Sequence, residues 1–144
     1  MATERRAEVT WTGDLMSGSG RVDSVSSGAI EPLEVSWPAR SAEPDGKTSP
    51  EELIAAAHAT CLSMALSHGL AQEGHAPERL DTSATVTFQP GEGITKIALA
   101  VEGHVPGMDD DAFRRAAETA KENCPVSKAL AGVPEMTLDA KLAS

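Results

Sequence analysis

The chain has 144 residues, a formal net charge of −10 at pH 7 and an aromatic content of 3%. A chain of this length is expected to form a single domain, over residues 1–144, that buries about 68–70% of its unfolded surface and needs no disulfide framework. The negative charge repels phosphate backbones and few rings are present to stack on bases, which argues against nucleic acid as a partner.

The N-terminal residues predict no targeting segment. They are polar up to Arg6 and lack the apolar stretch of a signal peptide. Charged residues or glycines interrupt each apolar run before it reaches the length of a membrane span. We therefore expect a cytoplasmic protein without a membrane partner, in a compartment that keeps thiols reduced.

The first 40 residues predict β structure with turns. Val9 and Trp11 alternate with polar neighbours, and residues 17–20, Ser-Gly-Ser-Gly, predict a turn before the next extended segment. A loop rich in proline and polar residues follows, and it extends over residues 41–48. The N-terminal third is therefore expected to be β-rich and to end in this loop.

A long helix begins directly after the loop. Ser49 is a suitable N-cap, Pro50 fits the first helical position, and Glu52 completes a capping box. The helix should run to about Glu73 and end at Gly74. Its residues 53–66 are apolar on nearly every side, which is typical of a helix that is buried all round. Because a domain of this size can seldom surround a helix, we expect a second subunit to supply part of its cover.

The C-terminal half predicts a hairpin followed by helices and a last strand. Apolar residues alternate over residues 84–88 and 97–101, on either side of the turn at residues 90–93. Helical spacing and Pro125 then predict two helices, and renewed alternation predicts a strand, over residues 109–124, 125–130 and 136–142. This order of strands and helices favours an α+β fold.

The two cysteines are the main candidates for chemistry. Cys61 lies inside the apolar helix, and Cys124 lies at a helix end directly before Pro125. If Cys124 caps the short helix that follows, the free amides and the helix dipole there would lower its pKa. Two nearby thiols could act as an attacking and a resolving cysteine. Buried cysteines also act as small apolar residues, and from the residues alone both interpretations stay open.

His58 lies one turn before Cys61 and shares a face of the helix with it. It could be the general base of a Cys-His hydrolase or one ligand of a zinc site. A packed, hydrogen-bonded histidine is the more common arrangement. No second closely spaced ligand pair accompanies it, so we expect no metal site.

Three segments resemble the OsmC family: residues 50–67, 94–99 and 124–130. The resemblance covers nearly the whole chain and is closer to OsmC proper than to the organic hydroperoxide resistance branch. It implies an intertwined α+β homodimer with antiparallel sheets around a long buried central helix. It also implies a cofactor-free, thiol-dependent peroxidase that reduces organic hydroperoxides, and hydrogen peroxide more weakly, to alcohols.

The resemblance also implies roles for individual residues. Cys61 would attack the hydroperoxide and become a sulfenic acid, and Cys124 would condense with it to a disulfide. A dithiol reductant, with a lipoyl-type compound as the candidate, would restore both thiols. Glu51 matches the family's glutamate, and Arg40 is the best match for its arginine, with Arg21 as the alternative. The arginine would stabilise the thiolate, and the glutamate would orient it through a bidentate pair.

Two other functions fit the same residues. One is a hydrolase that uses Cys61 and His58. The other is a non-enzymatic dimer of this fold that binds a small molecule or a metal.

Helix geometry predicts that the site is shared between two chains. Glu51 and Cys61 are ten residues apart on one helix, which places them about 15 Å apart along its axis and roughly 80° apart around it. Glu51 therefore cannot act on the thiol of its own chain. In a homodimer with antiparallel central helices, Glu51 of one chain would come near Cys61 of the other.

Overall fold

The computed structural model describes residues 1–143. They divide into two compact units, Met1–Leu53 and Ile54–Ser144, which are described separately. The long helix α2 begins in the first unit and continues into the second. The prediction of a single domain over residues 1–144 concerns how these units fold together, and it stays a prediction.

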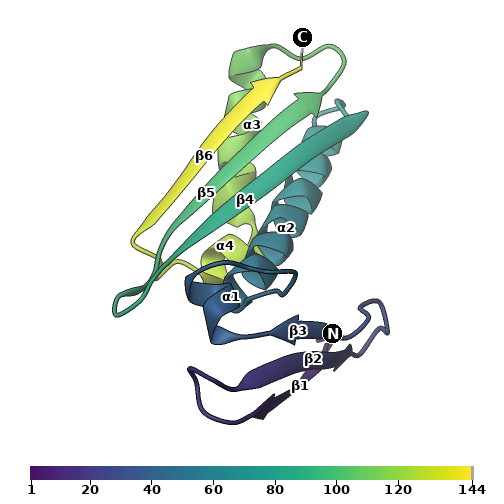
Figure 1. Ribbon diagram of the computed structural model, residues 1–144. Helices are drawn as coiled ribbons and strands as arrows, with labels where there is room; N and C mark the ends of the chain where they lie inside the picture. The colour runs from purple at the N-terminus through teal and green to yellow at the C-terminus, as the bar shows by residue number, and fades with distance from the viewer. Residues whose placement is uncertain (144) are drawn as a thin grey trace. The chain divides into compact units, whose positions relative to one another are not determined.

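The first unit contains a small antiparallel sheet, as the alternation near the N-terminus predicts. Its strands are hydrogen-bonded in the order β1-β2-β3 (Figure 1). Their bounds, with those of the short helix α1, are β1 (Ala7–Thr12), β2 (Ser19–Val25), β3 (Leu33–Val35) and α1 (Trp37–Ser41).

Helix α1 lies where the sequence predicted only β structure and loop. Ser36 is its N-cap, and the Ser36 hydroxyl accepts a hydrogen bond from the Ala39 amide at 3.1 Å. Pro38 lies in the first helical positions, where no amide hydrogen is needed. This combination of a serine cap and a proline predicts a helix start, but the short element has no apolar periodicity to support it.

Helix α2 (Pro50–Gln72) has the predicted bounds within a residue at each end. The Ser49 hydroxyl accepts a hydrogen bond from the Glu52 amide at 3.2 Å, as an N-cap should. The capping box is only half formed, however, because the Glu52 carboxylate accepts from the Thr48 hydroxyl at 2.8 Å instead. Gly74 follows the helix with a φ of 84°, a conformation that favours glycine.

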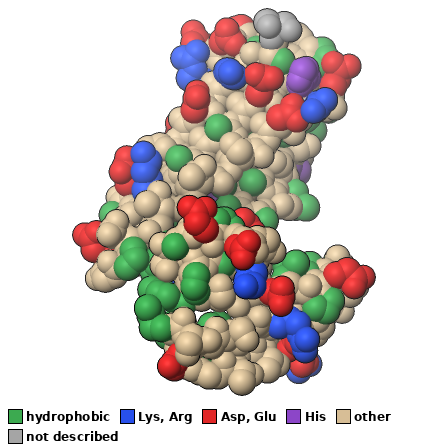
Figure 2. Space-filling model, viewed as in Figure 1, with side chains coloured by type: hydrophobic (Ala, Val, Ile, Leu, Met, Phe, Trp, Pro, Cys, Tyr) green, Lys and Arg blue, Asp and Glu red, His purple; other side chains and the backbone are tan. Residues whose placement is uncertain are grey.

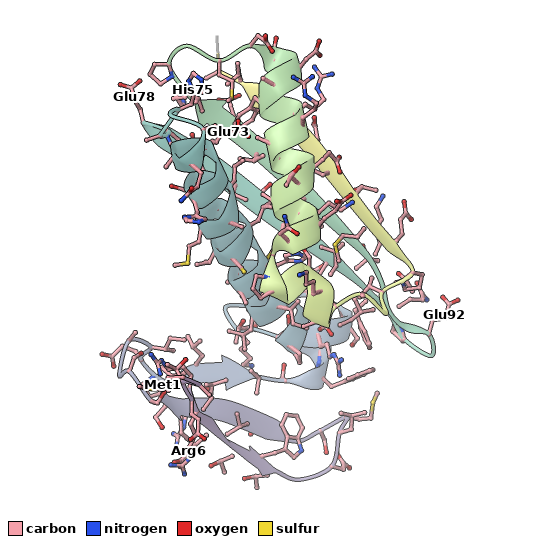
Figure 3. All side chains as sticks on the ribbon, turned by 180° about the vertical axis from the view of Figure 1, so that it is seen from behind. Met1, Arg6, Glu73, His75, Glu78 and Glu92 are labelled. Atoms are coloured by element: carbon pink, nitrogen blue, oxygen red, sulfur yellow. The ribbon has the colours of Figure 1, made fainter. Side chains whose placement is uncertain are left out.

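The second unit packs two helices on one face of a three-stranded sheet. Helices α2 and α3 cover the same face, and both views agree on this arrangement (Figures 1 and 3). Glu92 marks the tip of the β4–β5 hairpin in Figure 3. The remaining elements are β4 (Arg79–Gln89), β5 (Gly93–His104), α3 (Asp110–Asn123), α4 (Pro125–Ala129) and β6 (Glu135–Leu142).

The sheet of the second unit is mixed, which corrects the prediction of antiparallel sheets. Strands β4 and β5 form the predicted antiparallel hairpin, but β6 pairs with β5 in parallel. The chain leaves the end of β5, passes through α3 and α4, and starts β6 beside the start of β5, at Lys96 and Glu135. Such a helical crossover is the usual connection between parallel strands.

Within one chain, only one face of α2 is buried. The sequence predicted burial all round with part of the cover from a second subunit, and that cover stays a prediction. Leu62, Leu66 and Leu70 recur at four-residue spacing and are fully buried. They pack into one core with Ile97, Leu99, Val101, Phe113 and Ala117. Met64 lies on another face of the helix and is 67% exposed. The sheet and α3 cover one side of α2, and this accounts for the one-sided burial.

By length and composition alone, α2 is apolar enough to cross a membrane, contrary to the sequence-based expectation. The leucines of its buried face belong to the core of the second unit. A core helix passes the same test of length and composition.

Acidic side chains lie across the face shown in Figure 2, with basic side chains among them. The ion pairs between neighbouring strands of the second unit are exposed, for example Lys141 with Glu102 at 3.5 Å and Lys96 with Glu135 at 3.7 Å. Exposed pairs of this kind stabilise a protein by at most about 1 kcal/mol each. The surface charge therefore does not by itself mark a site.

Candidate active site

The two cysteines lie together in the second unit, although they are far apart in sequence. Cys61 is partly exposed on α2, and Cys124 is fully buried between α3 and α4. Both are free thiols, and the Cys61 thiol donates a hydrogen bond to the Cys124 sulfur. The structure thus brings into contact the two thiols that the sequence analysis singled out.

The surroundings of Cys124 favour its thiolate form. Burial raises the pKa of Cys124, but hydrogen bonds from the Cys61 thiol and from Ser127 outweigh burial and lower it on balance, with help from the Val126 amide. Cys124 is the N-cap of α4 with Pro125 at the first position, although its side chain makes no capping hydrogen bond. The predicted lowering of the Cys124 pKa by the start of the short helix is therefore confirmed in direction.

Within one chain the pKa of Cys61 is raised, as burial without a nearby cation should do. Burial raises it, and the hydrogen bond that the Cys61 thiol donates to Cys124 raises it further. The Val126 amide has a smaller, opposite effect. The resemblance implies that an arginine stabilises the Cys61 thiolate, and this stays a prediction. Within one chain, the surroundings therefore favour the thiol form of Cys61 and the thiolate form of Cys124.

His58 is a packed, hydrogen-bonded histidine, as the sequence analysis favoured. Its Nε2 atom lies 2.7 Å from the Ser127 hydroxyl oxygen, and its side chain is fully buried. Within the described residues its Nδ1 atom has no hydrogen-bond partner, so the ring does not act as a base toward Cys61. Burial lowers the pKa of His58, which keeps the ring neutral. The Cys-His pair of a hydrolase is not formed.

Ser127 is a site residue that the sequence analysis did not identify. It lies three residues after Cys124, and it contacts both His58 and the Cys124 sulfur. The signal was present, because an N-cap residue and the third helical residue face one another at a helix start.

Arg40 and Glu51 form a bidentate ion pair within the first unit. The Arg40 Nη2 atom lies 2.9 Å from Glu51 Oε2, and Arg40 Nε lies 3.1 Å from both carboxylate oxygens. The Glu51 side chain is nearly buried, whereas that of Arg40 is about one-third exposed. The glutamate therefore orients the guanidinium in the manner expected of this pair.

Arg21, the alternative arginine, lies on β2 and pairs with Asp23 at 2.7 Å. Its side chain is 59% exposed. Arg21 and Asp23 lie on the same strand, and their ion pair is exposed to solvent. Such a pair holds a guanidinium less firmly than the buried Glu51 carboxylate does. The geometry within the first unit therefore favours Arg40 as the oriented arginine.

An apolar pocket of about 290 Å³ lies in the first unit beside Arg40. Its walls are almost entirely hydrophobic and include one rim of the small sheet and the start of α2. The lining residues are Val9, Trp11, Leu15, Val22, Val35, Ser36, Trp37, Arg40, Pro50 and Leu53. The pocket offers an apolar molecule one positively charged group.

A further group of possible metal ligands lies on the sheet of the second unit. Asp81, Glu102 and His104 hold their ligand atoms within 4.8 Å of one another. The carboxylates are already paired, Asp81 with Arg79 at 2.9 Å and Glu102 with Lys141 at 3.5 Å. Paired, solvent-exposed carboxylates of this kind are common without a metal ion.

Known proteins resemble this chain over its full length. Residues 43–139 match the family described as OsmC-like protein. The chain is 42% identical to Peroxiredoxin OsmC of Escherichia coli strain K12, and the match covers 100% of both proteins. It is 24% identical to the organic hydroperoxide resistance protein OhrB of Bacillus subtilis strain 168, over 91% of this chain and 98% of that protein.

The fold is also found among solved structures. An organic hydroperoxide resistance protein from Elizabethkingia anophelis has a TM-score of 0.71 with this chain at 23% identity. The superposition covers 99% of this chain and 100% of that protein. At this identity the similarity concerns the fold alone, and it agrees with the α+β class that the sequence predicts.

Proposed function

The chain belongs to the OsmC-like protein family, and on that premise we propose that it is a thiol-dependent peroxidase that reduces organic hydroperoxides to alcohols. The observation that carries the proposal is the contact between Cys61 and Cys124. Two thiols in contact can form and break a disulfide without a large movement of the chain. The names of both relatives, a peroxiredoxin and an organic hydroperoxide resistance protein, support the same reaction.

The reaction has two steps on the enzyme. The Cys61 thiolate attacks one oxygen of the hydroperoxide, the O–O bond breaks, and the other oxygen leaves as the alcohol after it takes up a proton. Cys61 is now a sulfenic acid, and Cys124 condenses with it to a disulfide and water. A dithiol reductant, for which we propose a lipoyl-type compound, restores both thiols by exchange.

The first step needs a cation near Cys61, because its pKa is raised within one chain. We propose that the protein is a homodimer and that the partner's Arg40 supplies this charge. Helix geometry supports the proposal, because Glu51 and Cys61 lie on one unbroken helix and about 15 Å apart along its axis. The exposed apolar side chains of α2, such as Met64, are available to pack against a second copy of the helix.

The apolar pocket beside Arg40 supports an organic substrate. Its hydrophobic lining would hold the carbon chain of an organic hydroperoxide, and the guanidinium would hold a peroxide oxygen. Hydrogen peroxide has no carbon chain to bind there, and we therefore infer that it is reduced more weakly. A cytoplasmic location, where thiols are kept reduced, belongs to the same proposal.

The rival functions lack a supporting observation of this kind. A Cys-His hydrolase would need His58 next to Cys61, but the His58 Nε2 atom is occupied by Ser127. A binding protein without peroxidase activity would not need two thiols in contact.

The experiment is a count of free thiols before and after one equivalent of cumene hydroperoxide. The peroxidase should lose two thiols per chain, and release one equivalent of alcohol. Cys61→Ser should lose none and release no alcohol. Cys124→Ser should release one equivalent of alcohol and stop at the sulfenic acid, which dimedone traps. An unchanged thiol count in the unmodified protein would contradict the proposed function.

A further inference from the structure

The side chains of His58 and Ser127 form a buried polar pair next to the two thiols. His58 lies on α2, one turn before Cys61, and Ser127 lies on α4, three residues after Cys124. His58 is 0% exposed and Ser127 is 7% exposed, and the His58 Nε2 atom lies 2.7 Å from Ser127 Oγ. The pair therefore joins the helix that carries one thiol to the helix that begins at the other.

Packing alone does not explain a histidine at this position. A buried polar atom destabilises a protein unless it has a hydrogen-bond partner. The His58 Nδ1 atom is buried and, over residues 1–143, has no such partner. An apolar side chain of similar size would fill the space without an unpaired nitrogen. The imidazole is therefore present despite a cost in stability, which indicates a role for its Nε2 atom.

The direction of the hydrogen bond follows from the protons available. A neutral imidazole carries one N–H, and a serine hydroxyl can donate one hydrogen bond while it accepts others. If the proton is on Nε2, His58 donates to Ser127 and the unpaired Nδ1 is an acceptor. If the proton is on Nδ1, the unpaired atom is a buried N–H, which is rarer in proteins. The arrangement therefore favours Nε2–H and leaves the Ser127 hydroxyl hydrogen available to another acceptor.

Cys124 is that acceptor. Cys124 is the N-cap of α4 and Ser127 is its third residue, and side chains at these two positions face one another. The Ser127 side chain makes a hydrogen bond to the Cys124 sulfur. The donors then form a chain from His58 Nε2 through Ser127 Oγ to Cys124 Sγ.

We propose that His58 and Ser127 are a positioning pair that orients Cys124 and stabilises its thiolate for disulfide formation. The proposal rests on the peroxidase function and concerns its second step. In that step the Cys124 sulfur attacks the sulfenic sulfur of Cys61, the S–S bond forms and the S–O bond breaks. The hydroxide leaves as water with the proton that Cys124 released. Cys124 is oxidised and the sulfenic sulfur is reduced, so no further oxidant is required.

The test measures the two steps separately in a single turnover with cumene hydroperoxide. Alcohol release reports the attack by Cys61, and loss of the second thiol reports disulfide formation. Ser127→Ala and His58→Leu should slow disulfide formation about 10- to 100-fold, because the first removes the donor to the charged sulfur and the second removes the partner that orients this donor. Alcohol release should stay within about twofold of the unmodified rate, and dimedone should trap more sulfenic acid.

Conservative variants distinguish positioning from packing. His58→Gln places an amide N–H near the position of Nε2, and Ser127→Thr keeps the hydroxyl, so both should restore much of the rate of disulfide formation. Ser63→Ala is the matched control, because it removes another hydroxyl of α2, which bonds Thr82 at 2.7 Å. It should change neither step. Equal slowing of both steps, or no slowing of the second, would overturn the proposal.

The tautomer of His58 gives an independent measurement on the unmodified protein. The ¹⁵N chemical shifts of the ring should show the proton on Nε2 and a bare Nδ1. A proton on Nδ1 would overturn the proposal even if every variant fails to fold. An unmodified protein that consumes no hydroperoxide would instead contradict the proposed function. The tautomer would still show whether His58 donates its hydrogen bond to Ser127.

Discussion

Cys61 and Cys124 are chemically identical side chains with an ordinary pKa of about 8.5, and only their surroundings separate them. Burial and the donated hydrogen bond raise the pKa of Cys61. Hydrogen bonds from Cys61 and Ser127 overcome burial and lower the pKa of Cys124. A peroxidatic Cys61 therefore needs a cation from outside its own surroundings, and this requirement leads to the first prediction.

Arg40→Ala should raise the pKa of Cys61. If the partner's Arg40 stabilises the Cys61 thiolate, its removal leaves the effects of burial and of Cys124, and both raise the pKa of Cys61. The measurement is the pH dependence of Cys61 alkylation, followed by mass spectrometry of its peptide. Arg21→Ala is the matched control and should leave the profile unchanged. A shift in the Arg21 variant alone would show that the wrong arginine was assigned.

His58 should make folding stability depend on pH. Burial lowers its pKa in the folded protein, so the unfolded chain binds a proton more readily below about pH 6.5. The free energy of unfolding should therefore fall as pH falls below that value, by at most about 1.4 kcal/mol per pH unit, until the folded-state pKa is reached. Urea unfolding of the unmodified protein and of His58→Gln should show a steeper loss in the unmodified protein. Parallel curves would contradict this prediction.

At the scale of elements, capping and turn residues were sufficient to predict a helix or a hairpin where they coincide with apolar periodicity. The N-cap at Ser49 and the glycine after the helix predicted the bounds of α2, and strict alternation predicted the β4–β5 hairpin. The parallel pairing of β6 was not predictable in this way, because alternation reveals a strand but not the direction of its neighbour. The crossover through α3 decides that direction.

The contact between β5 and α3 depends on a glycine. A Cβ atom at Gly103 would lie 2.5 Å from the buried ring of Phe113, whereas a Cβ at Gly69 in α2 would meet nothing within 4 Å. Gly103→Ala should therefore lower the free energy of unfolding by about 1–3 kcal/mol through overpacking. Gly69→Ala is the control with the opposite sign and should raise it by about 0.5–1 kcal/mol. Urea unfolding measures both, and equal effects would contradict this account of the contact.

At the scale of the whole molecule, the proposed site uses residues of two chains. Cys61 and Cys124 are in contact within one chain, and Arg40 is held by Glu51 of the same chain. Helix geometry keeps Glu51 about 15 Å from Cys61 along α2. The thiol pair of one chain and the ion pair of its partner would therefore form one site.

Mixing two impaired variants tests this arrangement. Cys61→Ser and Glu51→Ala proteins, mixed under conditions that exchange subunits, should recover activity above both parents, because each hybrid contains one site with Cys61 and Glu51 intact. A mixture of Cys61→Ser and Cys124→Ser is the matched control. It should recover nothing, because both cysteines of a site belong to one chain. Proven exchange without recovery in the first mixture would place the whole site in a single chain.

The sequence by itself determined the local structure, and its resemblance to the OsmC family indicated the candidate reactive groups. Caps, glycines and apolar spacing depend on neighbouring residues, so α2, the hairpin and the helix start at Cys124 could be predicted. The pairing of Arg40 with Glu51 came from the resemblance and not from a local pattern. Only the tertiary structure decided the direction of β6, which face of α2 is buried within the chain, and the contacts of Ser127. It also decided that, within one chain, the pKa of Cys61 is raised and that of Cys124 is lowered. These features depend on burial and on contacts between residues distant in sequence, which no local pattern contains.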